Sequence, residues 1–391
     1  MSDFAWVVDT FFILFAFSLI ILMVPGFAML EAGLVRTKNV TTVLTINTII
    51  YIIASLVFFF WGYTLAFGEW NETNMSKYAA FLFQMAFVGK TINIMSGGIS
   101  ERTRVIPIAI FAIIMAGFIY PIVVNITWGA NILKGTLLDI SSMHDLAGST
   151  VIHSTGGWAL LAAILIIGSR KGRYTKSGKV RVIPASNIPL VVLGGFLLWI
   201  GWFGFNGGSV GNISTKEAAN SVALVIMNTN NAGLIGGFIV IILSYLTYKK
   251  FDITMIVNGA LGGLVAITAG ADVISPYKAL LIGAIGGALV FYAVPFFDKL
   301  KMDDPVGALS VHLINGIWGT LASGIFGKGV SIITQIKGII EVGIFAFVTS
   351  YIAIYLIDKF IPFRIEEEQE IEGLDINECG IEAYPEFRRV I

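Results

Sequence analysis

Cysteine, histidine and charged side chains are all scarce in this chain of 391 residues. The single cysteine, Cys379, cannot form an intrachain disulfide, and it excludes every metal cluster that is built on several thiolates. A total of three histidines argues against a histidine-rich metal site. We therefore predict no metal site and no bound cofactor.

The shortage of charge accompanies an excess of hydrophobic residues. Only 13% of the residues are charged, whereas soluble domains have roughly 25%. Hydrophobic residues make up 56% of the chain, and the mean hydropathy is +0.85. The formal net charge is zero, which argues against a nucleic-acid partner. This composition predicts a polytopic membrane protein that has the lipid bilayer as its surroundings.

Eleven segments are long enough to cross a bilayer, which takes about 20 apolar residues each. The first is not expected to be a cleaved signal peptide, because it is too long and carries Asp3 and Asp9 with no Lys or Arg before it. Glycine pairs such as Gly236-Gly237 and Gly286-Gly287 predict seams of close helix packing. We predict an all-α membrane protein of eleven transmembrane helices, at about 5–30, 40–66, 78–98, 104–128, 148–169, 187–206, 217–247, 252–271, 276–297, 306–326 and 334–361.

Basic residues are divided unequally between the two alternate sets of loops. The positive-inside rule makes the richer set cytoplasmic, so we predict the N-terminus outside and, after eleven spans, the C-terminus inside. The richer set has fourteen, namely Arg36, Lys38, Arg102, Arg104, Arg170, Lys171, Arg173, Lys176, Lys179, Arg181, Lys249, Lys250, Lys299 and Lys301. The other set has six, namely Lys77, Lys134, Lys216, Lys278, Lys328 and Lys337.

The predicted membrane domain, residues 1–362, divides into two halves of five spans. The halves cover about 1–170 and 187–326, and a last helix follows at about 334–361. An odd number of spans inverts the second half relative to the first, as in many transporters. His153 and His312 occupy the fifth span of each half, so a pseudo-two-fold axis predicts that they meet near the membrane midplane.

Both histidines lie on helix faces of small and polar residues. Because ionisable groups are costly in a bilayer, a symmetry-matched pair favours a functional site over two packed core histidines. The residues at three- and four-residue spacing are Asn315, Gly316, Gly319, Thr320 and Ser323 beside His312, and Ser149, Gly156, Gly157 and Ala163 beside His153.

Three functions could use two imidazoles inside a membrane. They could ligate a b-type haem, act as acid and base in an intramembrane enzyme, or line a pathway for a small solute that exchanges protons. The enzyme hypothesis is weak, because the sequence has no HExxH, GxSxG or P-loop motif and no second carboxylate beside the histidines. The residues alone leave haem binding and transport open.

Several motifs resemble those of the ammonium transporter family, in order along almost the whole chain. The stretch DLAGSTVIHSTGG, at 145–157, is similar to the family's Asp-Phe-Ala-Gly-Gly-Thr-Val-Val-His signature. The resemblance implies a prokaryotic-type transporter of ammonium or ammonia in the plasma membrane, not an enzyme. It also implies a homotrimer of eleven-helix subunits, each with its own pore and a cytoplasmic C-terminus. The other matching motifs are FAMLEAGLVRTKNV (27–40), ISERTRV (99–105), GWFGFNGGS (201–209), NTNNA (228–232) and DDPVGALSVH (303–312).

The resemblance assigns four residues to the outer mouth of a pore. Trp128 and Ser209 correspond to the site that recruits ammonium, where the cation meets an aromatic face and a hydroxyl. An aromatic face attracts a desolvated cation by about 1–2 kcal/mol. Phe87 and Phe205 correspond to two stacked phenylalanines that close the mouth.

Three further residues are assigned to the pore and its entrance. His153 and His312 correspond to the family's paired histidines, which would bind ammonia after deprotonation of ammonium and relay protons. Asp145 matches the aspartate of the signature, and its position predicts an N-cap that stabilises the fifth span by about 1 kcal/mol, with substrate binding as a second role. Lys90, inside the third span, is expected to snorkel or to pair with a helix end.

Residues 363–391 form an acidic tail that we predict to be cytoplasmic. Composition alone predicts a solvated extension. The segment GLDINECGIEAYPEF, at 373–387, resembles the family's C-terminal regulatory segment, which implies a PII-family nitrogen regulatory protein as a partner. The basic loops, including 170–181, would complement such a partner. A sensor with this fold would be expected to add a signalling domain, so the short tail favours a transporter.

Overall fold

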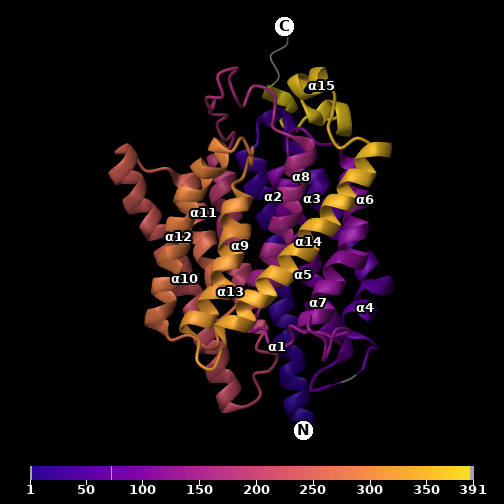
Figure 1. The fold of residues 1–391 in the computed structure, drawn as a ribbon, viewed down its shortest axis with the longest axis vertical. Coiled ribbons are helices and arrows are strands. Elements are labelled where there is room, and N and C mark those ends of the chain that lie inside the picture. The colour runs from indigo at the N-terminus through magenta and orange to yellow at the C-terminus, as the bar shows by residue number, and fades with distance from the viewer. Residues whose placement is uncertain (1, 72, 388–391) are drawn as a thin grey trace.

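The chain is an elongated bundle of helices in a computed structural model that describes residues 2–71 and 73–387. Within these residues the only β-type pairs are the isolated bridges Thr103–Arg364 and Tyr174–Val180. The helices lie mostly along one long axis, and the two ends of the chain lie at opposite ends of the bundle (Figure 1). We call these ends the N-terminal end and the tail end. The predicted all-α class is confirmed.

Ten helical segments in the described residues are long and apolar enough to cross a membrane. The predicted segment 252–271 contains a shorter helix, α11 (Ile253–Ile267), which is followed by turns. Length and composition therefore establish ten of the eleven predicted spans. The ten are built from α1 (Asp3–Ile21) with α2 (Met23–Leu34); α3 (Val40–Val57), the π-helix η2 (Phe58–Gly62) and α4 (Tyr63–Phe67); α5 (Lys77–Gly98); α6 (Val105–Ile114), η3 (Met115–Ile119) and α7 (Tyr120–Thr127); η4 (Ser149–Ser154) with α8 (Thr155–Ile167); α9 (Ile188–Gly208); α10 (Lys216–Tyr248); α12 (Pro276–Lys299); η5 (Leu309–Ile314) with α13 (Asn315–Phe326); and α14 (Ile332–Phe360).

Glycine allows α10, α11 and α12 to pack backbone against backbone. A Cβ atom added at Gly287 would overlap the carbonyl oxygen of Gly236, and one at Gly263 would overlap that of Ala232. Only a residue without a side chain fits at such a crossing, which confirms the predicted seam. The last long helix, α14, runs obliquely across the bundle and packs against α8 and α13 (Figure 1).

A buried ionic cluster joins the two halves at the tail end. Arg170 is 5% exposed, and its guanidinium lies 2.7 Å from Glu101 Oε2 and 2.8 Å from Asp303 Oδ2. Arg36 also pairs with Glu101, at 3.1 Å. The cluster consists of these four residues and the Arg173–Asp298 pair, at 2.7 Å. We had expected the loop 170–181 to offer charge to a partner, but its arginines 170 and 173 are occupied in this cluster.

The arginines of the cluster keep its carboxylates ionised. Burial alone would raise the pKa of Glu101, but Arg170 and Arg36 hold that pKa below its usual range. Burial would likewise raise the pKa of Asp303, and hydrogen bonds from Arg170 together with the charge of Arg102 lower it to about 2. Because a buried ion pair is costly to break, the cluster fixes the relative position of the loops that carry it.

The acidic tail folds onto the tail end of the bundle. It contains α15 (Glu367–Glu372), the π-helix η6 (Asp375–Cys379) and a short 3-10 turn, Pro385–Phe387. Asp375 is 1% exposed and caps α3, because its carboxylate accepts hydrogen bonds from the backbone N–H groups of Thr41 and Thr42, at 3.0 and 2.8 Å. A solvated extension was therefore the wrong interpretation of this part of the tail. Residues 388–391 lie outside the described residues.

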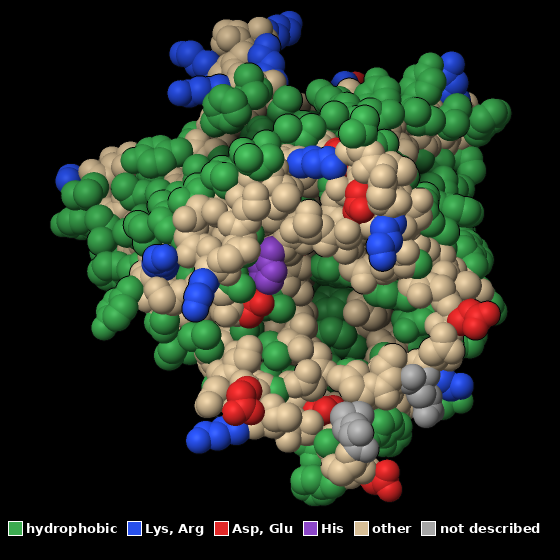
Figure 2. Space-filling view, turned by 60° about the horizontal axis from the view of Figure 1, so that its bottom comes forward, with side chains coloured by type: hydrophobic (Ala, Val, Ile, Leu, Met, Phe, Trp, Pro, Cys, Tyr) green, Lys and Arg blue, Asp and Glu red, His purple; other side chains and the backbone are tan. Residues whose placement is uncertain are grey.

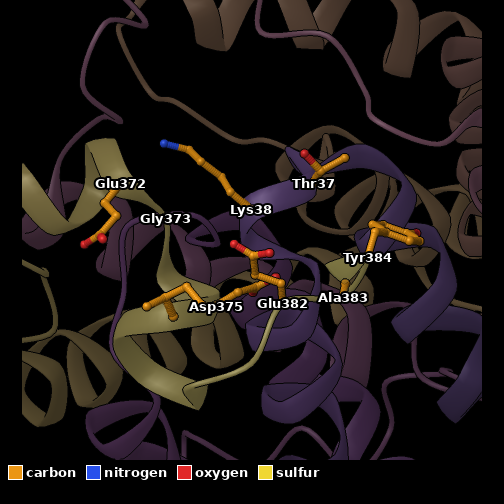
Figure 3. Close-up of a pocket in the computed structure, with 9 residues that line it drawn as sticks. Thr37, Lys38, Glu372, Gly373, Asp375, Glu382, Ala383 and Tyr384 are labelled. Carbon is orange, nitrogen blue, oxygen red and sulfur yellow. The ribbon is translucent and has the colours of Figure 1, made fainter. Parts of the chain in front are cut away.

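A pocket of about 350 Å³ lies between the tail and the residues just before α3 on which the tail rests. We call this place the tail seat. Figure 3 shows Lys38 and Thr37 on one side of it, and Glu372, Asp375 and Glu382 of the tail around the other. The Lys38 ammonium donates a hydrogen bond to the backbone carbonyl of residue 370, at 3.0 Å, and another to that of residue 371. The tail is thus held by both polar side chains and backbone groups.

Lys90 does not reach water. It is 2% exposed within α5, and its Nζ lies 6.0 Å from the centre of the Tyr51 ring on α3. The expectation that it snorkels was wrong, because the middle of a span is too far from either surface. An aromatic face is the interaction that the structure provides for this cation.

Candidate functional site

The two histidines of the membrane domain touch in its interior. The Nδ1 atoms of His153 and His312 lie 3.1 Å apart, and the rings are nearly parallel at 18°, with their centroids 5.2 Å apart. The side chains are buried, and the residues are 2% and 6% exposed. The predicted meeting of the histidines is confirmed. In this contact one Nδ1 donates and the other accepts, so the protonation of the two rings is linked.

Each histidine lies in a π-helical segment that an aspartate caps from eight residues upstream. The Asp145 carboxylate accepts hydrogen bonds from the backbone N–H groups of residues 148 to 151, at 2.8 to 3.0 Å. Asp304 accepts them from residues 306, 307 and 309, at 2.7 to 3.2 Å. The predicted cap role of Asp145 matches this geometry. Burial raises the pKa of both aspartates, against these hydrogen bonds.

The two caps share a pattern that sequence reasoning missed. Asp145, Gly148 and His153 have the same spacing as Asp304, Gly307 and His312. Both glycines have positive φ, +105° and +80°, which bends the chain so that the aspartate meets the following N–H groups. The repeat was a signal that could have identified Asp304 as the counterpart of Asp145.

The small and polar faces beside the histidines hold the two spans together. Thr150 and Thr320 share a hydrogen bond of 2.6 Å between their hydroxyls. A Cβ at Gly316 would lie 2.5 Å from the Ser149 carbonyl oxygen, so η4 and α13 cross closely there. The Asn315 amide donates to the Ser310 carbonyl at 3.1 Å. The threonine pair thus joins the two spans, whereas the Asn315 bond lies within one of them.

A pocket opens at the N-terminal end of the bundle, and three of the predicted residues line it. The pocket has a volume of about 260 Å³ and is lined by Trp128, Ser209 and Phe87, together with Gln84. Figure 2 shows a hollow with hydrophobic walls in this face of the molecule. Trp128 Nε1 donates to the Asp145 carbonyl at 2.7 Å, which fixes the indole. Gln84, whose Oε1 is buried without a hydrogen-bond partner among the described residues, was missed.

Two phenylalanines separate this pocket from the histidines. Phe87 and Phe205 are 1% and 0% exposed, and their ring centroids lie 4.6 Å apart. The interplanar angle is 84°, so the predicted stacking was wrong and the rings meet edge to face. Phe205 then lies 5.6 Å from the His153 ring. Trp202, which sequence reasoning also missed, stacks on His153 at 5.1 Å.

The histidine pair leaves one polar atom free and leaves no place for a metal between its rings. His153 Nε2 is buried and has no hydrogen-bond partner among the described residues. An imidazole nitrogen binds a metal at about 2.0 Å, so two of them on opposite sides of an iron would lie about 4 Å apart. The observed 3.1 Å between the Nδ1 atoms is a direct ring contact. The pair therefore does not hold an iron between its Nδ1 atoms, and the unpaired Nε2 of His153 offers a hydrogen-bonding atom to a small solute.

Comparison with known proteins identifies the family. A model described as the Ammonium Transporter Family matches residues 11–384. The chain belongs to this family. It is 33% identical to ammonium transporter Amt2 of Archaeoglobus fulgidus, over 98% of this chain and 88% of the relative.

Solved structures of the ammonium transporter family share the fold. A structure titled Sensor Amt Protein aligns with a TM-score of 0.90 at 32% identity, and covers 97% of this chain and 100% of its own. Candida albicans Mep2 aligns with a TM-score of 0.83 at 25% identity, over 98% and 92%. The family consists of ammonium transporters, which are not enzymes, and its members are multi-pass membrane proteins.

Proposed function

We propose that the chain carries ammonium across the plasma membrane by passing it through the bundle as ammonia. Ammonium enters the pocket between Trp128 and Ser209 and loses a proton. Ammonia then passes Phe87 and Phe205 and crosses beside the two histidines. The observation that carries this proposal is the buried Nε2 of His153, which has no hydrogen-bond partner among the described residues. Phe205 separates His153 from the outer pocket, and the ring of His312 lies beside it.

The apolar path explains how such a pore discriminates between ions of similar size. Potassium cannot shed its charge, so the path between Phe205 and His312 would cost it many kcal/mol. Ammonium avoids that cost by leaving its proton behind. The linked rings of His153 and His312 offer a route for the proton as well, because one Nδ1 donates to the other across their 3.1 Å contact.

We further propose eleven spans, with the N-terminus outside, the tail in the cytoplasm and a homotrimer as the working unit. Helix α11 extends about 22 Å at 1.5 Å per residue. Residues 258–267 of α11 are all buried between its neighbours, so this helix need not match the full thickness of the bilayer. The distribution of basic loop residues supports the orientation, and family membership supports the trimer.

The first prediction is that the purified protein, reconstituted in liposomes, responds to pulses of ammonium or methylammonium with a current or with an internal pH change faster than that of protein-free liposomes. Equal pulses of potassium or sodium should give neither response. The reason is the cost of a bare ion beyond Phe205. Solid-supported membrane recordings, with a pH dye inside the liposomes, measure both charge and proton movement. A potassium current comparable to the ammonium current would contradict the deprotonation step.

Sensing is the second candidate function, because the structure titled Sensor Amt Protein aligns over almost the whole chain. The same recordings separate the two functions. A sensor would bind ammonium without carrying sustained flux, whereas a transporter would continuously raise the internal pH, because entering ammonia takes up protons, or would charge the liposomes.

A PII-family regulatory protein is the partner that we propose for the tail end. The tail seat with its pocket (Figure 3) and the exposed Lys176, Lys179 and Arg181 provide a mixed surface there. Charged surfaces of this kind set partner choice and association rate more than affinity.

The second prediction concerns deletion of residues 373–391. The membrane bundle satisfies its own backbone hydrogen bonds, so the truncated chain should insert and assemble as a trimer. Loss of the Asp375 cap should cost α3 about 1 kcal/mol. Size-exclusion chromatography, transport currents and binding of a purified PII protein measure the outcome. Transport at the full rate with unchanged PII binding would show that the tail has no regulatory role.

A further inference from the structure

Glu31 is a carboxylate inside the membrane domain that the proposed mechanism does not use. It lies near the end of α2, within the first membrane span, and is 2% exposed. Among the described residues no Lys, Arg or His forms an ion pair with it. An ionisable group placed in a membrane without a basic partner is costly, and such groups usually mark a pathway for ions or protons.

Asparagines from two neighbouring helices hold the carboxylate in place. Asn47 of α3 donates from Nδ2 to Glu31 Oε2 at 2.8 Å. Asn93 of α5 donates to Asn47 Oδ1 in turn. These bonds fix one carboxylate oxygen, and the structure gives Oε1 no hydrogen bond within the described residues. The chain therefore orients Glu31 without giving it a positively charged partner.

The Glu31 carboxyl group and His312 line the same cavity. Glu31, Asn93, Asn258 and His312 line a space of about 20 Å³ on the tail-end side of the histidine pair. A space of this size holds about one molecule of water. Ammonium has nearly the same size, so one ion fits.

The lining offers the acceptors that an ammonium ion needs. The Nδ2 atoms of Asn93 and Asn258 are already used, since they donate to Asn47 Oδ1 and to the Val306 carbonyl. The Oδ1 oxygens of Asn93 and Asn258 accept no hydrogen bond among the described residues, so they remain available. Two amide oxygens and a carboxylate oxygen suit a cation that has four N–H donors.

Few other charges face this cavity. Helices α9 and α11 contain no titratable residue, and α3 contributes only Tyr51. On α5, Lys90 lies against the Tyr51 ring, and Lys77 is at the far end of the helix. His312 lines the cavity itself, and Asp304 is tied to the backbone N–H groups before η5. On α1, Asp9 is bonded to the loop after α9.

We propose that Glu31, Asn93 and Asn258 form a binding site for one ammonium ion on the cytoplasmic side of the histidine pair. The inference rests on the proposed function and adds an exit site to it. A buried carboxyl group without a basic partner keeps its proton. Ammonia that reaches the site takes this proton from Glu31, and the resulting carboxylate binds the ammonium ion that has formed. When ammonium leaves for the cytoplasm, Glu31 takes a proton back from the water of the cytoplasmic vestibule.

The test uses the full-length protein reconstituted in lipid, with ammonium chloride as the ligand and sodium chloride at equal concentration as the salt control. Infrared difference spectra report whether a carboxyl group changes when ammonium is added. We expect a carboxylate band in the unaltered protein that is absent from Glu31→Gln. The matched control is Glu341→Gln, which makes the same change in another membrane helix, at a carboxylate that lies 3.9 Å from Lys337. The control should keep the band.

Transport measurements provide a second readout. A hydrogen bond to a charged group contributes enough that its loss weakens binding about tenfold, so Glu31→Gln should reduce the ammonium current about tenfold. Its discrimination against potassium should be unchanged, because the Trp128 pocket and the two phenylalanines are intact. If Glu31 had a purely structural role, Glu31→Gln would lower the current but would keep the ammonium-dependent carboxylate band.

Each outcome decides between the two proposals. If the unaltered protein carries ammonium current but shows no ammonium-dependent carboxyl band, or if Glu31→Gln keeps the band, the exit site is wrong and the transport function stands. If the unaltered protein gives neither an ammonium current nor an internal pH change faster than that of protein-free liposomes, the proposed function itself fails. Should Glu31→Gln not fold, Glu31→Asp keeps the charge and shortens the side chain. A half-saturating ammonium concentration for the band that is identical in Glu31→Asp and the unaltered protein would overturn the site.

Discussion

Replacing His153 or His312 with alanine should lower ammonium transport about 100-fold or change which solutes pass, and should leave a folded trimer. The size of the effect follows from the proposed proton relay, because a positioned proton-transfer group contributes about 10² to 10⁴ in rate. The remaining ring loses its partner at 3.1 Å, at a cost of about 1–3 kcal/mol. Ammonium-evoked currents, together with size-exclusion chromatography, measure the two effects separately.

The third histidine provides the matched control for the pair. His144 lies outside the helices, its side chain is 29% exposed, and its Nε2 lies 2.9 Å from Asp272 Oδ1. His144→Ala removes the same chemical group at a site that lines neither cavity. It should retain transport and selectivity. Wild-type rate and selectivity in His153→Ala or His312→Ala would show that the pair is structural.

Replacing Arg170 with methionine should destabilise the protein by about 3–5 kcal/mol. Methionine leaves the buried carboxylates of Glu101 and Asp303 without their shared partner, and an unpaired buried charge costs that much. Arg181→Met, an exposed position in the same loop, should change the free energy of unfolding by less than about 0.5 kcal/mol. Thermal unfolding in detergent compares the two. Equal melting temperatures for both variants would mean that the cluster contributes nothing to stability.

The same cluster predicts the response to acid. The pKa of Asp303 is about 2 in the folded chain, below the value of about 3.9 in an unfolded chain. A lowered pKa contributes stability above the unfolded value, and that contribution is lost as the pH falls through the folded value. The unaltered protein should therefore lose stability as the pH falls from about 4 toward 2. Asp303→Asn should show a shallower loss over that range, and equal slopes would contradict this account.

Composition and symmetry were enough to predict the fold class and the histidine pair. Charge content and span length depend only on the sequence, so the all-α membrane class followed directly. The meeting of His153 and His312 required only that two halves of five spans be inverted relative to each other. The cap role of Asp145 was also predictable, because an aspartate just before a helix accepts hydrogen bonds from the free N–H groups of the first turn.

Features that depend on three-dimensional packing could not be predicted. The edge-to-face contact of Phe87 and Phe205 depends on the rotation of two helices, which residue type does not specify. Counting basic loop residues predicts an orientation, but it could not show that Arg170 is buried between two acids. Lys90 was misjudged because its neighbour Tyr51 is distant in the sequence.

The tail was misjudged for a related reason. Its nine acidic residues indicated a solvated segment. Asp375 instead accepts a hydrogen bond from Thr42 at the start of α3, and these two residues lie 333 positions apart in the sequence. Composition reports how much charge a segment carries, and it cannot report which N–H groups that charge will meet.

The ionic cluster also has a consequence for how the chain is made. Glu101 is separated from Arg170 by 69 residues, but Asp303 is separated from it by 133. At about 5–20 residues per second, the ribosome reaches Asp303 roughly 7 to 27 s after Arg170. During that interval Arg36 and Arg170 share the single carboxylate of Glu101, so the nascent first half keeps a positive charge there. In the proposed orientation this charge retains the loop on the side of synthesis, and the later Asp303 then fixes the loop in place.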